Sequence, residues 1–271
     1  MEEKIILISG ASKGIGKSCA TYLAKKGFTV YGTSRKAKET PIKKNGFYLI
    51  NMDVDDEKSV KKTVDYIIKK HGHIDILINN AGWGISGAIE DTDVKTSKEL
   101  FETNFFGVHR LCRNVLPYMR KKGHGRIINI SSIGGIIGLP FQGFYSASKF
   151  AVEGYTEALR LEVESFGIKV SMLEPGDIKT DFTNKRKKIS FDNDNSVYKN
   201  HSKRTISIVE KDEQNGVEPI VVAERIYKII IKKNPKLRYK VGSFSQKLVG
   251  NLKGFFPDRT VQWIIKKYYK T

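Results

Sequence analysis

Short apolar runs alternate along the chain with longer stretches whose apolar residues recur at helical spacing. A short apolar run fits a strand covered on both faces, and apolar residues three and four positions apart fit a helix with one buried face. This alternation predicts an α/β fold: a Rossmann-type doubly wound parallel sheet in a three-layer αβα arrangement. The expected strands span residues 5–8, 29–33, 48–52, 74–78, 127–130, 169–173 and 238–241, and the expected helices span 17–26, 57–71, 98–121, 146–166 and 219–233.

The same pattern indicates one large domain followed by an extension. A chain of 271 residues can bury a full core, and the alternation continues to about residue 241. The polar stretch 177–216 has no clear hydrophobic period, so we expect a long loop there. Loops of that length in compact domains are usually lids over a binding site or disordered segments. Residues 242–271 then form a basic, aromatic C-terminal extension.

Charge and cysteine content indicate which partners and which cellular compartment to expect for the protein. The net charge is +19, and residues 177–271 contribute +12 of it, with 22 basic and 10 acidic side chains. An anionic cofactor, an acidic membrane surface or nucleic acid could each meet such a surface. The two cysteines cannot form a disulfide framework, and no apolar run is long enough to span a bilayer. We expect a cytoplasmic protein.

A glycine-rich turn follows the first strand and precedes the first helix. Its residues are Gly10, Ser12, Lys13, Gly14, Ile15 and Gly16, with the glycines in a GxxxGxG spacing. Glycines there permit a tight turn and a close approach of the backbone to a pyrophosphate, and the helix N-terminus favours negative charge. The position predicts a nucleotide-binding site.

The end of the second strand indicates which nucleotide is bound. NAD-binding folds place an acidic residue there against the ribose hydroxyls, but this chain has Ser34 and Arg35. Together with Lys13, Arg35 supplies cations that suit a 2′-phosphate. We therefore expect NADP(H). Asp53, with Val54 beside it, is a candidate contact for the adenine, although an acid there can also belong to a helix cap.

Tyr145 and Lys149 form the candidate reacting pair. Four residues apart on a helix, they share one face, and a nearby ammonium lowers the pKa of a phenol by favouring the phenolate. Tyr145 is then a candidate proton donor and acceptor for a carbonyl/alcohol pair.

Together these motifs resemble those of the short-chain dehydrogenase/reductases. The resemblance rests on Gly10xxxGly14xGly16, Asn79-Asn80-Ala81-Gly82, Asn104, Ser132, Tyr145xxxLys149, and Pro175-Gly176 followed by Thr180, and it covers residues 5 to about 241. It implies a catalytic domain over 1–241, with 177–216 as its substrate lid. It also implies that Tyr145 is the acid/base, that Lys149 lowers its pKa and holds the nicotinamide ribose, that Ser132 binds the substrate oxygen, and that Asn104 positions a relay water. Ser131 is set aside as the catalytic serine, because its spacing to Tyr145 is one residue longer than the family pattern has. The further cofactor contacts implied are Ile15, Asn80, Ala81, Gly82, Pro175, Gly176, Ile178 and Thr180.

A narrower resemblance points to the 17β-hydroxysteroid and retinol dehydrogenase branch. It rests on residues 131–141 and 145–154. In this family the substrate side is lined by the residues between the serine and the tyrosine, which here are apolar. Such a wall favours a lipophilic ketone, aldehyde or alcohol. The candidate substrate residues are Trp83, Ser132, Ile133, Leu139, Phe141, Phe144 and Phe182.

Other interpretations remain at this point. A nucleotide-sensing or scaffold protein without turnover would share the same sheet. His71 and His73 lack a third ligand at suitable spacing, so we expect no metal site, and no nucleic-acid motif accompanies the basic runs. The family resemblance implies a homodimer through helices 98–121 and 146–166, with a tetramer still open.

The C-terminal extension predicts one further amphipathic helix. Pro257 and Asp258 resemble a helix start, and Val261, Ile264, Ile265 and Tyr268 form an apolar face. This face either packs beside the lid and closes the substrate cleft or meets an anionic bilayer. The aromatic and basic residues of the extension are Phe244, Lys247, Lys253, Phe255, Phe256, Trp263, Lys266, Lys267, Tyr269 and Lys270.

Overall fold

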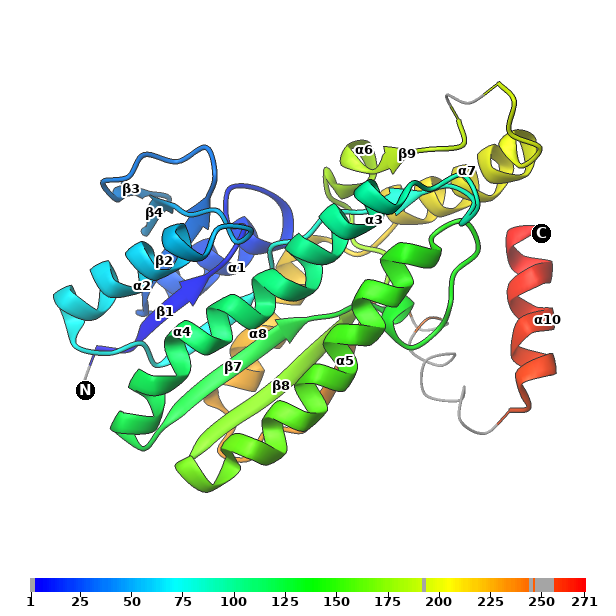
Figure 1. The fold of residues 1–271 in the computed structure, drawn as a ribbon. Helices are drawn as coiled ribbons and strands as arrows, with labels where there is room; N and C mark the ends of the chain where they lie inside the picture. The colour runs from blue at the N-terminus through cyan, green and yellow to red at the C-terminus, as the bar shows by residue number, and fades with distance from the viewer. Residues whose placement is uncertain (1–2, 192–193, 244–245, 247–255) are drawn as a thin grey trace.

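A computed structural model describes residues 3–191, 194–243, 246 and 256–271. Its main sheet has the strand order β10-β8-β7-β5-β1-β2-β4-β3 and is parallel except for β3, which runs antiparallel to β4. Figure 1 shows this sheet with helices on both faces. The strands are β1 (Ile5–Ile8), β2 (Thr29–Ser34), β3 (Ile42–Lys44), β4 (Phe47–Asn51), β5 (Ile76–Asn79), β7 (Gly125–Ile130), β8 (Ile168–Pro175) and β10 (Arg238–Val241).

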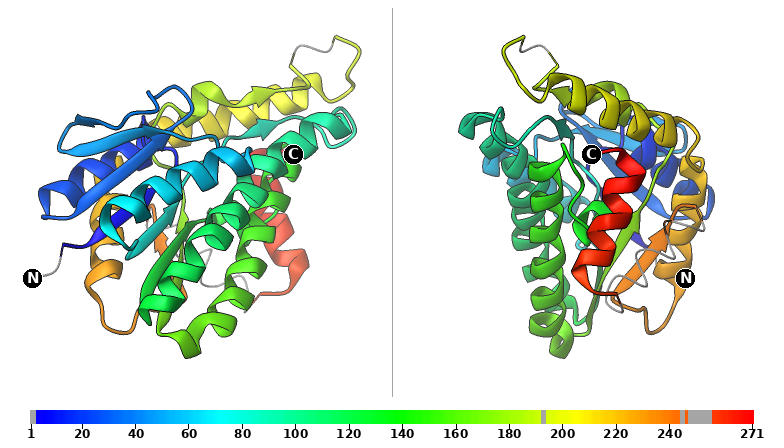
Figure 2. Two further views of the ribbon diagram at one scale, coloured as in Figure 1. Left: turned by 60° about the vertical axis from the view of Figure 1, so that its left-hand side comes forward. Right: turned by 90° about the vertical axis from the view of Figure 1, so that its right-hand side faces the viewer.

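The helices divide into two layers, so the predicted Rossmann-type αβα fold is confirmed (Figures 1 and 2). One layer packs on its sheet face through the core that contains Val64, Leu111 and Val152, and the other through the core that contains Leu23 and Ile226. The first layer consists of α2 (Glu57–His71), α4 (Gly107–Lys122) and α5 (Gly143–Val163), and the second of α1 (Gly14–Lys25) and α8 (Pro219–Ile231).

Local sequence explains why these elements begin and end where they do. All four residues of β1 are fully buried, which suits a central strand covered by helices on both sides. The Asp56 carboxylate accepts a hydrogen bond from the Lys58 amide at the start of α2, and Gly72 ends that helix in the left-handed conformation, with φ of 79°. Parallel pairing then places the carboxyl ends of β1, β5, β7 and β8 at one edge of the sheet.

The expected helix over 98–121 is two helices joined by a wider turn. It begins as α3 (Val94–Phe101), where the Asp93 carboxylate caps the Thr96 amide at 2.7 Å, and passes through a π-helical turn, Glu102–Phe106, into α4. The extra residue in such a turn changes the direction of the side chains that follow. Asn104 lies in this turn and is fully buried.

The expectation of a long loop over 177–216 is wrong. The segment contains α6 (Phe182–Lys185), a short strand β9 (Lys187–Lys188) paired with β6 (Ile85–Ser86), and the 16-residue helix α7 (Lys199–Gln214). The buried face of α7 combines Ser202 and Thr205 with Ile206 and Val209. Because half of that face is hydroxyl-bearing, its hydrophobic period is weak. Figure 1 shows α6 and α7 beyond the carboxyl ends of β7 and β8.

The C-terminal extension contains the predicted helix, α10 (Asp258–Tyr269). Val261 is buried, but Ile264 and Tyr268 of the predicted apolar face are exposed by 41% and 55%. Two hydrogen bonds join α10 to α7, from the Thr205 hydroxyl to the Tyr269 carbonyl at 3.2 Å and from the Tyr268 hydroxyl to Asp212 at 2.7 Å. Phe244, Lys247, Lys253 and Phe255 lie outside the described residues. None of the described helices is long and apolar enough to cross a membrane.

Candidate active site

The glycine turn after β1 is shaped for close approach of a ligand to the backbone. Gly10 has φ of +70°, and a Cβ on Gly16 would collide with the Gly10 carbonyl and the Asn80 side-chain amide. No side chain caps the N-terminus of α1 at Lys13. The first amides of this helix can therefore bind a pyrophosphate, so the turn fits a dinucleotide.

Neighbouring segments hold this turn in place. The Asn80 side-chain amide donates to the carbonyls of Ser9 at 2.9 Å and Gly10 at 3.1 Å, while the Ser9 hydroxyl accepts from the backbone amides of Asn80 and Ala81. On the other side, Thr180 lies 3.5 Å from where a Cβ on Gly14 would be. The structure thus brings together predicted cofactor residues from three separate segments.

The candidate phosphate-binding cations lie at the rim of this site. Arg35 follows β2 and is exposed, as the prediction requires, with half-buried Ser34 beside it. Lys13 forms an ion pair with Asp181 at 3.6 Å, in which both side chains are more than half exposed, and so it also connects the turn to the segment before α6.

The candidate adenine contacts follow β4. The Asp53 carboxylate accepts a hydrogen bond from the Asp55 amide at 3.1 Å, which is the local turn contact that an acid before a helix often makes. Val54 is buried, and its carbonyl accepts from Arg110 at 3.1 Å. Further along this edge, Ile178 is buried and Gly176 is half-buried after Pro175, the last residue of β8.

Ser132, Leu139 and Tyr145 converge on one point at the carboxyl edge of the sheet. A Cβ on Gly134 would lie 3.5 Å from the Ser132 hydroxyl, 3.4 Å from the Tyr145 ring and 3.3 Å from Leu139. Ser132 ends the segment after β7, and Tyr145 lies in the first turn of α5. Because the Ser132 hydroxyl also acts on the pKa of Tyr145, the two hydroxyls lie close together beside the apolar Leu139 side chain.

Asn104 and Lys149 meet at a second point, beside Gly82. A Cβ on Gly82 would lie 3.0 Å from the Asn104 side-chain oxygen and 3.8 Å from the Lys149 Nζ. The Asn104 side chain bonds the backbone amide and carbonyl of Trp83, each at 3.0 Å, and donates to the Ser148 hydroxyl at 3.1 Å. Asn104, Ser132, Tyr145 and Lys149, which come from three segments of the chain, are thus gathered at one edge of the sheet.

The expectation that Lys149 lowers the Tyr145 pKa is not met in this structure. Burial of the phenol raises its pKa above the ordinary value, although the Ser132 hydroxyl partly counters this. The Lys149 Nζ lies 6.0 Å from the centroid of the Tyr145 ring and donates to the Ile130 carbonyl at 2.9 Å. Burial also lowers the pKa of Lys149 to about 8.

Most of the predicted substrate wall lies around the same place. Phe182 packs against Tyr145 with 5.8 Å between ring centroids, and the Ile133 Cδ1 lies 3.1 Å from where a Cβ on Gly176 would be. Phe141 instead contacts Tyr198, 6.4 Å between centroids, just before α7. The remaining members, Trp83, Leu139 and Phe144, are half-buried.

Sequence reasoning missed two residues that hold this site. The Ser148 hydroxyl donates to the Tyr145 carbonyl at 2.7 Å and joins that helix to Asn104. Arg186 is buried inside the lid segment 177–216, where it is bound to Glu213 and lies 5.7 Å from the centroid of the Phe182 ring. Its place in a run of four basic residues suggested a solvated loop, and no local signal distinguishes it from its neighbours. Within the described part of the chain, no group of three or more residues could hold a metal ion.

A nucleotide cradle beside a half-buried serine and tyrosine and a buried lysine, at the edge of a parallel sheet, defines a nicotinamide-dependent oxidoreductase of the Rossmann class. The chain belongs to the short-chain dehydrogenase/reductase family: residues 4–189 match the family model described as short chain dehydrogenase.

Related sequences and structures agree with this assignment. The chain is 48% identical to a 3-ketodihydrosphingosine reductase of Bacteroides thetaiotaomicron over 99% of both chains, and 39% identical to human retinol dehydrogenase 8 over 67% of this chain and 61% of that protein. A short-chain dehydrogenase from Streptomyces avermitilis superposes with a TM-score of 0.81 at 30% identity, covering 99% of this chain and 97% of the other. The NADP-bound structure of ElxO superposes with a TM-score of 0.70 at 29% identity, covering 88% and 97%.

Proposed function

We propose that this enzyme uses NADPH to reduce a long-chain lipophilic ketone, with 3-ketodihydrosphingosine as the leading candidate. The observation that carries the proposal is the convergence of Ser132, Tyr145 and Leu139 at Gly134, where two hydroxyl donors face an apolar wall. The relative with 48% identity over nearly the full chain carries the name of that activity. We propose the reductive direction of the reaction, in which Tyr145 donates a proton to the carbonyl oxygen.

Each residue has a definite task in this proposal. Nicotinamide supplies the hydride when bound. Tyr145 donates a proton to the carbonyl oxygen, and Ser132 donates a hydrogen bond that holds this oxygen in place. The Lys149 ammonium binds the nicotinamide ribose. Asn104 orders the water from which Tyr145 regains its proton.

The cofactor preference is assigned on charge. Arg35 is an exposed cation at the end of β2, where an acid would repel a 2′-phosphate, and the structurally similar ElxO was solved with NADP. The segment 177–216, with α7 in place of a loop, is proposed to close the substrate side, because Phe182 within it contacts Tyr145.

The proposal is tested by following NADPH consumption with a matched pair of substrates. The first is 3-ketodihydrosphingosine in mixed micelles, and the second is a short-chain ketone with the same polar end. We expect turnover of the long-chain ketone with NADPH in at least about tenfold preference to NADH and to the short-chain ketone. Equal turnover of the two ketones would refute the lipophilic assignment, and no oxidation of NADPH by either would refute the proposed reaction.

A further inference from the structure

A buried cluster of charged residues lies directly behind the proposed reaction centre. Glu153 is one helical turn beyond Lys149 on α5, and both side chains are buried. From β10, the Arg238 Nε lies 3.1 Å from Glu153 and 3.4 Å from Glu174 of β8, and the Lys240 Nζ lies 3.3 Å from Glu174. The cluster therefore joins the helix that carries Tyr145 and Lys149 to two strands at the end of the sheet.

The buried carboxylates of this cluster are matched by its own cations. Glu153 and Glu174 face Arg238 and Lys240, while Glu157, which also pairs with Arg238, is 50% exposed. A buried charge is costly unless an opposite charge lies near it. Lys149 supplies a third cation one turn away from Glu153.

The Ser131 hydroxyl lies close to the aliphatic stem of Lys149. The Ser131 hydroxyl and the Lys149 Cβ lie 2.6 and 3.2 Å from where a Cβ on Gly135 would be. Burial raises the pKa of the Glu153 carboxyl, while the Ser131 hydroxyl acts to lower it and the charge of Glu174 adds to the rise. Ser131, which the spacing to the tyrosine excludes as the catalytic serine, thus faces the cluster.

Lys149 depends on a partner to remain protonated. Burial lowers its pKa to about 8, and the charge of Glu153 acts against this shift. The Ile130 carbonyl, the Tyr145 ring and the Asn104 side chain, which also lie near its Nζ, carry no charge. Without a negative charge behind it, a lysine this deeply buried would lose its proton close to neutral pH.

We propose that Glu153 is a positioning residue for Lys149: its carboxylate, fixed in the core by Arg238, keeps the Lys149 ammonium charged beside Tyr145. This inference rests on the proposed function only in giving Lys149 a working role in the reaction. The protonation of Lys149 is itself a property of the protein without substrate.

The direct test is an NMR titration of Lys149 in the free protein. Protein labelled with 13C at lysine Cε is titrated by pH, and the Lys149 signal is assigned by its loss in a Lys149→Met variant. In Glu153→Gln we expect the Lys149 midpoint to fall by about one pH unit or more, since removing a buried anion one helical turn away favours the neutral amine.

Glu157→Gln is the matched control. Glu157 lies one turn further along α5 and also pairs with Arg238, but its side chain is 50% exposed. Because exposed charges are well screened, we expect the Lys149 midpoint to stay within about 0.2 units of the unaltered protein. An unmoved midpoint in Glu153→Gln, or an equal fall in both variants, would overturn the proposal.

A rescue variant and a binding measurement distinguish a positioning role of Glu153 from a purely structural one. Glu153→Asp restores the negative charge, so the Lys149 titration midpoint should return most of the way to its value in the unaltered protein. A loss of packing alone would not be rescued in this way. The affinity for NADPH, measured by cofactor fluorescence, should decline as the pH is raised, and in Glu153→Gln this decline should begin at a lower pH than in the unaltered protein. If Glu153→Gln does not fold, Glu153→Gln/Arg238→Gln is compared with Arg238→Gln, and an identical Lys149 midpoint in those two variants again overturns the proposal. A protein that titrates as expected but never oxidises NADPH would refute the proposed function and leave this inference standing.

Discussion

At the scale of single residues, the site separates the group that moves a proton from the groups that hold it. Tyr145 is held by the Ser148 contact to its carbonyl and by packing against Phe182, and neither contact involves the phenol oxygen. The hydroxyl itself is approached by the Ser132 side chain, which acts to lower its pKa.

Tyr145→Phe should abolish turnover and leave cofactor binding intact. The ring and its packing remain, and only the transferable proton is removed, so we expect kcat to fall by about a hundredfold or more. The measurement is NADPH oxidation together with the NADPH dissociation constant. Tyr198→Phe, which removes a hydroxyl bound to Glu90 away from the reacting groups, is the control. More than a tenth of the original activity in Tyr145→Phe would remove this residue from its role.

Arg35→Asp should reverse the cofactor preference. An acid at the end of β2 repels a 2′-phosphate and can accept hydrogen bonds from free ribose hydroxyls. We expect the affinity for NADPH to fall by about ten- to a hundredfold, because one charge-assisted contact is lost, while the affinity for NADH rises. Lys36→Asp, the same change at the next exposed cation, should have a smaller effect. If the unaltered enzyme uses both cofactors equally, Arg35 does not select between them.

At the scale of elements, the sequence predicts what local patterns encode. The strands that form the centre of the sheet follow from short apolar runs, and the reacting set follows from fixed spacings such as the one from Tyr145 to Lys149. Helix α7 could not be found in this way, because Ser202 and Thr205 interrupt its apolar face. The edge strand β3 has three exposed residues and thus no apolar signal.

Contacts between segments that lie far apart in the chain could not be predicted from the sequence either. Arg238 and Glu153 are 85 positions apart, and only the pairing of β10 with β8 brings them together. The π-helical turn that directs Asn104 into the site likewise has no recognisable local sequence signal. The residues of the site could be predicted from family motifs, whereas the network behind them required the fold.

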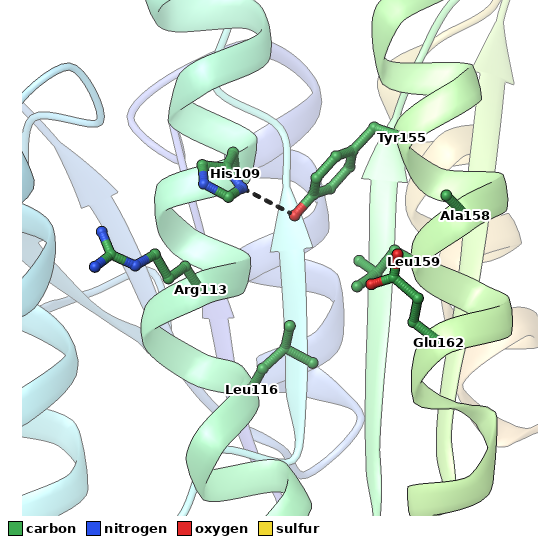
Figure 3. A pocket seen from close by; sticks show the side chains of 7 residues that line it. All are labelled: His109, Arg113, Leu116, Tyr155, Ala158, Leu159 and Glu162. Carbon is green, nitrogen blue, oxygen red and sulfur yellow. Dashed lines mark hydrogen bonds between the residues drawn. The ribbon is translucent and has the colours of Figure 1, made fainter.

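The outer faces of α4 and α5 are the proposed dimer surface. A groove between them is lined by His109, Arg113, Leu116, Tyr155, Ala158, Leu159 and Glu162, and the His109 ring and the Tyr155 hydroxyl face each other at 3.4 Å across it (Figure 3). Leu161 of α5 and Phe106 in the turn before α4 are exposed. Apolar side chains on neighbouring helices favour a partner helix pair.

Leu161→Arg should therefore dissociate the dimer. Leu161 is 77% exposed, so the change removes nothing from the core of the protomer, yet it places a charge in the proposed interface. Light scattering at micromolar concentration should give a dimer for the unaltered protein and a monomer for the variant. Ile231→Arg, at an exposed position at the end of α8, should remain a dimer. A monomer before any substitution would refute the assignment.

At the scale of the whole molecule, the C-terminal helix α10 can be interpreted as a cover of the substrate cleft or as a membrane contact. Its hydrogen bonds to Thr205 and Asp212 place it beside α7, as a cover requires. Trp263 and Ile264 of α10, and Phe256 just before it, are nevertheless exposed by 41% or more. A cover that served the cleft alone would have no need of these apolar side chains.

We propose that these exposed side chains rest on an anionic membrane surface, where a lipophilic ketone would be found. Aromatic residues beside lysines suit the headgroup region, and the Lys267 Nζ lies 5.1 Å from the centroid of the Trp263 ring. Full-length protein should sediment with phosphatidylserine vesicles at low salt and be released at high salt. Changing Lys266, Lys267 and Lys270 to glutamine should weaken binding by roughly a hundredfold, since each lysine near such a surface contributes about 1 kcal/mol.

The control for that experiment replaces three exposed lysines of α2, Lys58, Lys61 and Lys62, with glutamine. The net charge then falls by the same amount, so a loss of binding confined to the α10 variant assigns the contact to α10 and excludes a general effect of the basic surface. Trp263→Ser adds a second arm, because it removes apolar contact without altering charge. Equal weakening by both triple variants would leave only nonspecific attraction, and absence of binding by the unaltered protein would leave α10 as a cover of the cleft alone.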